Sequence, residues 1–140
     1  MEAVCLDIHP HILLAEDDLE LRELLVFVLS HAGCQVTSCD NGLQLLEQLE
    51  QAEKYDLVIS DVRMPALTGL EVLECLIDNP RRPPFICMTA FGDEKTHAKA
   101  LGLGATATID KPFDMDEMID LVRSTCLQAG RKNFFLRSQS

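Results

Sequence analysis

The strongest constraint in this sequence is the regular alternation of short, apolar, β-rich runs with longer segments that carry a helical stripe of hydrophobic residues. The first pair is residues 11–15 (HILLA) followed by residues 19–32, where apolar side chains recur at helical spacing. Asp18 stands at the expected N-cap of this helix, and Gly33 follows its last stripe residue. Both ends of the predicted helix therefore carry residues that favour them.

Four more units with the same order of strand and helix follow along the chain. The expected strands are residues 35–38, 55–60, 85–88 and 105–109, and the expected helices are residues 41–52, a segment that follows Gly69 and ends at the Asn79–Pro80 step, 93–101 and 114–127. Parallel neighbours in a sheet need a crossover connection, which a helix provides. We therefore predict an α/β fold: a doubly wound parallel sheet with helices on both faces.

The length of 140 residues corresponds to one domain, predicted over residues 1–128, with a short polar tail at 129–140 that is either frayed or the start of a linker. Asp and Glu total 23 against 12 Lys and Arg, and the formal charge of -11 repels nucleic acid and anionic bilayers. The apolar runs are far shorter than the ~20 residues that span a membrane, and no export signal is visible. Six cysteines without a C-x-x-C pair favour reduced core thiols. We expect a soluble, cytoplasmic protein.

In an open parallel sheet the functional site lies beyond the carboxyl ends of the strands. The predicted strands leave polar groups at these ends: Glu16 and Asp17 after the first, Asp61 after the third, Thr89 after the fourth, and Asp110 with Lys111 after the fifth. Three converging carboxylates stay ionised together only when a cation joins them, and oxygen ligands favour Mg²⁺. A lysine and a hydroxyl beside that cation suit a phosphoryl group, which a carboxylate can accept.

The motifs at these strand ends resemble those of the receiver domains of two-component response regulators, over about residues 10–128. The matching elements are ILLAEDD at 12–18, SDVRMP at 60–65 followed by TGL at 68–70, MTA at 88–90 and DKPF at 110–113. Each element alone is a weak signal, but all of them in order, each at a strand end, make a specific match. The resemblance implies a flavodoxin-like (βα)5 sandwich with a five-stranded sheet of order 2-1-3-4-5.

By position, the resemblance implies that Asp61 accepts the phosphoryl group. It also implies a Mg²⁺ site made of Glu16, Asp17, Asp61 and the main-chain carbonyl of Arg63. Glu16 replaces the more common Asp at its position, and we expect it to act through a metal-bound water. Asp18 is interpreted as a helix cap rather than as a third acid of the site.

The resemblance further implies that Thr89 donates a hydrogen bond to the phosphoryl oxygens and that Lys111 forms an ion pair with them. It implies a cis peptide bond between Lys111 and Pro112. Receivers often carry Tyr or Phe three residues before the Lys-Pro step, where this chain has Thr108. Signalling is therefore expected to run either through the loop after Thr89 or through the surface of the last two strand–helix units.

The function that the resemblance implies is that of a signalling module, which catalyses only its own phosphorylation and slow autodephosphorylation. It would take a phosphoryl group from a sensor histidine kinase or a phosphotransfer protein, switch an output partner, and form a phosphorylation-dependent homodimer. A haloacid-dehalogenase-type phosphohydrolase needs a second Asp where this chain has Arg63. A receiver-like scaffold that works without phosphorylation is the remaining alternative; the intact acids argue against it and Thr108 slightly for it.

Overall fold

The computed structural model describes residues 9–51 and 54–138, with side chains up to Ala129. In chain order the elements are β1 (His11–Ala15), α1 (Leu19–His31), β2 (Gln35–Cys39), α2 (Gly42–Glu50), β3 (Leu57–Asp61), α3 (Gly69–Cys75), β4 (Phe85–Ala90), α4 (Glu94–Gly102), β5 (Ala107–Lys111) and α5 (Met115–Ser138). The strands form a parallel sheet of order β2-β1-β3-β4-β5. The predicted fold class and strand order are confirmed.

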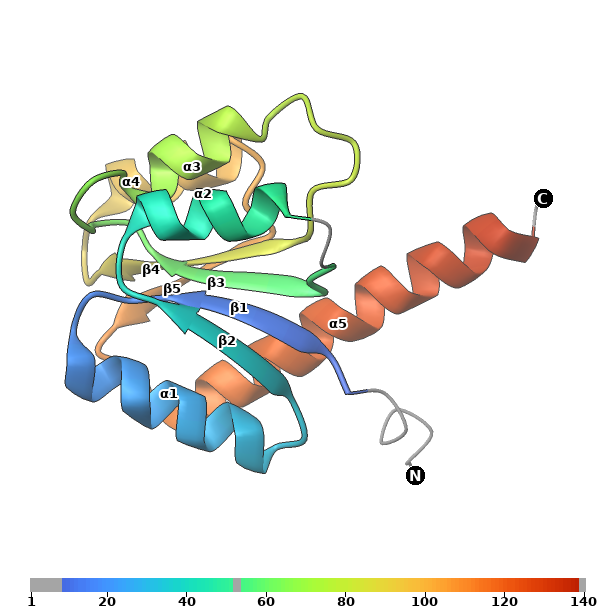
Figure 1. Cartoon of the computed structure of the whole chain (residues 1–140), viewed down its shortest axis with the longest axis horizontal. Coiled ribbons are helices and arrows are strands. Elements are labelled where there is room, and N and C mark those ends of the chain that lie inside the picture. The colour runs from blue at the N-terminus through green and yellow to red at the C-terminus, as the bar shows by residue number, and fades with distance from the viewer. Residues whose placement is uncertain (1–8, 52–53, 139–140) are drawn as a thin grey trace.

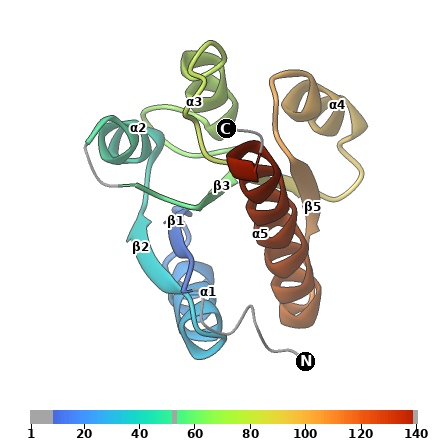
Figure 2. The same ribbon diagram turned by 90° about the vertical axis from the view of Figure 1, so that its right-hand side faces the viewer.

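Helices cover both faces of this sheet. α1 and α5 lie on one face and α2, α3 and α4 on the other (Figure 1), and Figure 2 shows the same two layers from a second direction. The chain first moves from β1 outward to β2 and then reverses toward β5, and right-handed crossovers in opposite directions place their helices on opposite faces. The reversal falls between β1 and β3, where the carboxyl ends of such a sheet open a site.

Two hydrophobic layers hold the helices against the sheet, because successive strand residues face opposite sides. In β1, Leu13 and Ala15 belong to the core under α2, α3 and α4, whereas Ile12 and Leu14 belong to the core under α1 and α5. The central strand β3 is buried at every position. This is the burial expected of a parallel strand that helices cover on both faces.

Local signals in the sequence operate as predicted at three positions. The Asp18 carboxylate caps α1 by accepting a hydrogen bond from the Leu21 N–H at 2.9 Å. Gly33 has a φ of 99° after this helix, a left-handed conformation that glycine adopts without steric cost. The Lys111–Pro112 peptide bond is cis, as the resemblance implied.

The third helix ends earlier than the sequence predicts. α3 stops at Cys75, although the next helix-breaking signal is the Asn79–Pro80 step. The side chain of Leu76 is buried and its N–H bonds back to carbonyls of the last helical turn. The chain therefore tightens into successive turns before it reaches the proline.

The last helix is longer than the sequence predicts. The helix expected over 114–127 is too short, because α5 is helical from Met115 to Ser138 and includes residues assigned to the polar tail at 129–140. Gly130 costs a helix interior only about 1 kcal/mol relative to alanine, and no proline follows it. The helix consequently runs past the edge of the sheet (Figure 1). Where the domain itself ends stays a prediction.

The described part of the chain contains no helix with both the length and the apolar character that crossing a membrane requires. The cysteines of this part are free thiols; Cys39 and Cys87 are buried, and Cys75 is exposed. Burial raises the pKa of the Cys87 thiol to about 12, so this thiol stays protonated at neutral pH. Cys5 and the first residues, to which the expectation about an export signal refers, lie outside the described residues.

Candidate functional site

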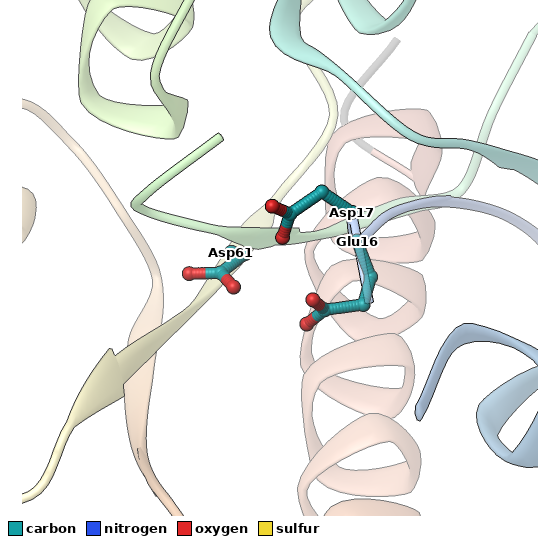
Figure 3. Close-up of side chains that lie close together, drawn as sticks. All are labelled: Glu16, Asp17 and Asp61. Carbon is teal, nitrogen blue, oxygen red and sulfur yellow. The ribbon is translucent and has the colours of Figure 1, made fainter. Parts of the chain in front are cut away.

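Three carboxylates meet at the carboxyl end of the sheet, at the point where the chain reverses. Glu16 and Asp17 directly follow β1, and Asp61 is the last residue of β3, whose register pairs Ser60 with Ala15. One carboxylate oxygen from each of the acids lies within 4.8 Å of one from each of the others. Figure 3 shows these side chains converging from the two neighbouring strands. The sequence prediction that they gather at one edge therefore agrees with the structure.

Lys111 reaches this cluster from the end of β5. Its Nζ atom donates to Glu16 Oε1 at 2.7 Å and to Asp61 Oδ2 at 2.6 Å. The side chain of Glu16 is only 1% exposed and that of Asp61 10%, so both carboxylates are shielded from water, whereas the Lys111 side chain is 26% exposed. We call Glu16, Asp17, Asp61 and Lys111 the acidic corner. It joins the ends of three strands that are far apart in the sequence.

Backbone donors complete the hydrogen bonding of the two buried acids. The Asp18 N–H donates to Glu16 Oε2, and the Arg63 N–H donates to Asp61 Oδ1, each at 3.0 Å. Each acid thus has one oxygen on Lys111 and the other on a main-chain N–H. This arrangement orients both carboxylates without using their remaining lone pairs.

Burial and charge shift the ionisation of this corner. Burial raises the pKa of Glu16, and the Asp61 charge adds to this, while the hydrogen bonds from Lys111 and Asp18 oppose it. Burial alone would lower the pKa of Lys111, but its hydrogen bonds to Asp61 and Glu16 outweigh that effect and raise it. Lys111 therefore stays charged at neutral pH and is the fixed cation of the corner.

The acidic corner has the composition of a divalent cation site. Its three carboxylates and one ammonium leave a formal charge of two negative units, and its donor atoms are all oxygens. Among the described residues the cluster consists of carboxylates without His or Cys, and such hard oxygen ligands fit Mg²⁺ better than zinc or copper. The residues therefore fit the metal that the sequence predicts.

Arg63, which follows Asp61 by two residues, connects this corner to α4. Its guanidinium lies 3.5 Å from the carboxylate of Asp93, the N-cap of α4, and the Arg63 side chain is 77% exposed. Hydrogen bonds from Thr96, with a smaller contribution from Arg63, lower the pKa of Asp93. The proposed metal ligand at this position is the Arg63 carbonyl, and its role stays a prediction.

Thr89 belongs to a second cluster, which we call the His97 network: Thr89, His97, Thr108 and Asp110. The buried hydroxyl of Thr89 lies 2.7 Å from His97 Nε2. The same ring nitrogen is 2.5 Å from Asp110 Oδ1, and His97 Nδ1 is 2.5 Å from the Thr108 hydroxyl. Sequence reasoning missed His97, because its position on α4 carries no motif and its contacts depend on how α4 packs against β5.

A family model and two curated relatives each match most of this chain. The family model described as "Response regulator receiver domain" matches residues 12–123. The transcriptional regulatory protein FixJ of Bradyrhizobium diazoefficiens is 35% identical over 119 residues, which cover 85% of this chain and 58% of FixJ. An uncharacterized 14.6 kDa protein of Leptolyngbya boryana is 36% identical over 118 residues, covering 83% of this chain and 89% of that protein.

Solved structures agree with this assignment. The receiver domain of the Francisella response regulator 1452 superposes with a TM-score of 0.81 at 25% identity, covering 86% of this chain and 99% of that one. The chain spans about half the length of the first curated relatives that it matches, from 48% to 58% of each. The similarity to those longer proteins thus concerns one part of each.

Proposed function

This chain belongs to the response regulator receiver domain family, and we propose on that basis that it accepts a phosphoryl group on Asp61 in a Mg²⁺-dependent reaction. The observation that carries this proposal is the position of Lys111, whose ammonium bridges Asp61 and Glu16 at the carboxyl end of the sheet. A buried carboxylate held by a lysine beside two further acids has the parts that phosphoryl transfer requires.

In the proposed reaction a carboxylate oxygen of Asp61 attacks the phosphorus of a phosphohistidine. An oxygen–phosphorus bond forms, the nitrogen–phosphorus bond breaks, and the histidine nitrogen keeps the electron pair. The Arg63 N–H and Lys111 hold the Asp61 carboxylate in one orientation before the attack. Lys111 then offsets negative charge on the transferred group, and Thr89 would donate a hydrogen bond to it.

Glu16, Asp17, Asp61 and the carbonyl of Arg63 are the residues that would hold the Mg²⁺ ion. When bound, the ion supplies positive charge that offsets the negative charge of the phosphoryl oxygens during transfer. Glu16 is longer than aspartate and its Oε1 already contacts Lys111. We therefore propose that Glu16 acts on the metal through a bound water.

The proposed donor is a sensor histidine kinase or a phosphotransfer protein, because those proteins present the phosphohistidine that such a site accepts. The output is a change in partner binding, which includes a homodimer formed after phosphorylation. We place the receiver over residues 1–128 and propose that it works in the cytoplasm. Light scattering with and without beryllofluoride tests the dimer, and a monomer under both conditions would contradict it.

Intact mass after incubation with acetyl phosphate and Mg²⁺ tests the central proposal. We expect one added phosphoryl group on the unmodified chain and none on Asp61→Asn or after removal of Mg²⁺. Asp78→Asn is the matched control, because Asp78 is exposed and lies away from the strand ends. If no adduct forms and beryllofluoride does not bind, the chain is a receiver-like scaffold that works without phosphorylation.

A further inference from the structure

We propose that His97 is a positioning residue that holds the Thr89 hydroxyl and transmits its movement to α4. The inference rests on the proposed function, because it takes Thr89 as a hydrogen-bond donor to the phosphoryl group. It assigns a role to a side chain that lies outside the acidic corner. The observation behind it is that one imidazole ring contacts β4 and β5 at the same time.

The sheet places the partners of His97 around its ring. Thr89 of β4 pairs directly with Asp110 of β5. Thr108 and Asp110 are two residues apart on β5, so their side chains lie on the same face of the strand. The side chain of His97, which comes from α4, is 18% exposed. The ring is therefore held between the two strands by three polar side chains.

In a neutral His97 ring one of the two nitrogens carries a hydrogen, and the donors and acceptors around the ring indicate which one. The Asp110 carboxylate only accepts, so Nε2 must carry the hydrogen that bonds to it. Nδ1 is then the acceptor and takes the hydrogen of the Thr108 hydroxyl. The Thr89 oxygen lies near the same Nε2–H and shares it with Asp110 as a second acceptor. Both ring nitrogens are thereby used within the network.

This assignment leaves the hydroxyl hydrogen of Thr89 with poor acceptors. The alternatives are Asp110 Oδ1 at 3.3 Å and the Ile109 carbonyl at 3.5 Å, both longer than the usual O–H···O bond of ~2.7–2.8 Å. Thr89 itself is fully buried, so water does not compensate. His97 thus fixes the hydroxyl oxygen while its hydrogen remains available for a better acceptor. A phosphoryl oxygen on Asp61 is such an acceptor.

α4 is well placed to respond when Thr89 changes partner. Ala100 is its one buried residue, so few apolar contacts anchor this helix. The contacts of His97 with Thr89, Thr108 and Asp110 therefore add to the attachment of this helix to the sheet. When the Thr89 side chain rotates toward a phosphoryl group, its oxygen moves away from Nε2–H, which weakens the bond that it accepts and loosens that attachment.

The test compares His97→Leu, which removes both ring nitrogens, with His97→Gln, which keeps an N–H donor. His31→Leu and His31→Gln are matched controls, because His31 is an exposed histidine on α1. Each full-length variant is assayed for the Asp61 adduct by mass, and for the change in amide hydrogen exchange of α4 when beryllofluoride and Mg²⁺ bind.

We expect the unmodified chain and both His31 variants to show the α4 change, His97→Leu to lose it while still forming the adduct, and His97→Gln to restore part of it. An α4 change in His97→Leu equal to that of the unmodified chain overturns the inference. Absence of both adduct and beryllofluoride binding in the unmodified chain refutes the proposed function instead, and this inference with it.

A second measurement does not depend on the variants folding. The ring nitrogens of His97 give separate ¹⁵N signals, which distinguish a ring protonated at Nε2 alone from other forms. We expect the Nε2–H form in the unmodified chain and a shift of the Nε2 signal when beryllofluoride binds. Unchanged His97 ring signals upon binding would contradict a link between Thr89 and this side chain.

Discussion

The acidic corner and the His97 network lie at the same end of the sheet but are built in different ways. In the acidic corner, an ammonium lies between two buried carboxylates, and every charged group lies in a strand or within two residues of its end. In the His97 network, hydrogen bonds connect two strands to a helix that has one buried residue. The sheet thus holds the charges of the proposed reaction, while we propose that α4 controls the hydroxyl beside them through His97.

The largest expected effect is the loss of stability when the positive charge of the acidic corner is removed. Lys111→Met removes the cation from the pair of Glu16 and Asp61 and leaves buried carboxylates without it. Without Mg²⁺ we expect a loss of about 3 kcal/mol in the free energy of unfolding. Mg²⁺ should stabilise the variant more than the unmodified chain, because it replaces the missing positive charge.

Urea unfolding with and without Mg²⁺ measures this effect. Lys95→Met is the control, because Lys95 is exposed on α4, and its effect should stay within about 0.5 kcal/mol. Equal losses of unfolding free energy in Lys111→Met and Lys95→Met would show that the stability of the acidic corner depends on a lysine charge no more than that of the α4 surface does.

The pH dependence of the stability of Lys111→Met tests the role of Glu16 in the acidic corner. The pKa of Glu16 is raised above 4.5 by burial, and the hydrogen bond from Lys111 opposes the rise. Removing Lys111 should raise this pKa further. A raised pKa in the folded state gives stability that is present below the pKa of the unfolded chain and is lost as the pH increases through the pKa of the folded chain.

We expect the stability deficit of Lys111→Met to be small near pH 4.5 and to grow toward pH 7, as urea unfolding in a pH series without metal would show. A deficit that does not change with pH would contradict the role of Glu16.

The next effect concerns how closely the chain packs against the backbone of Asp61. A Cβ atom on Gly69 would lie 2.4 Å from the carbonyl oxygen of Asp61, whereas one on Gly102 of α4 would meet nothing within 4 Å. We expect Gly69→Ala to cost about 2 kcal/mol in unfolding free energy, and Gly102→Ala to cost nothing or to stabilise slightly. Thermal unfolding of the pair tests this, and similar melting temperatures would show that the backbone at Asp61 yields easily.

A smaller effect is expected in the His97 network. Thr108→Val keeps the shape of the side chain but removes the hydroxyl that bonds to His97 Nδ1. We expect a loss of about 1 kcal/mol in unfolding free energy, the usual contribution of one hydrogen bond. Thr108→Ser retains the hydroxyl and should lie closer to the unmodified chain in the same denaturation assay. Equal stability of all three would mean that this bond contributes nothing.

The smallest effect on stability is expected for the ion pair that lies between the acidic corner and α4. Arg63 pairs with Asp93 across 3.5 Å, but its side chain is 77% exposed, and such surface pairs contribute little. We expect Arg63→Ala to leave the melting temperature unchanged in calorimetry. A clear decrease would show that the two regions are coupled through this pair as well as through Thr89.

Much of the fold follows from patterns that are local in the sequence. The strand–helix alternation predicts the sheet, and the strand-end residues Glu16, Asp17 and Asp61 do come together at one edge. This works because parallel strands put all their carboxyl ends at the same edge, so a position at the end of a strand is also a position in space. The ends of α3 and α5 were less predictable, because turns and helix continuation depend on small differences in free energy.

The fold class, the register of apolar positions and the identity of the groups at the strand ends could be read from the amino-acid order, since periodicity and strand direction are properties of the chain alone. The contacts of Lys111 with Glu16 and Asp61, and the contact of His97 on α4 with Thr89, became visible only in the folded chain. Both contacts depend on the reach of a side chain and on the packing of one element against another. No spacing in the sequence encodes that packing, because it results from the summed contacts of the whole core.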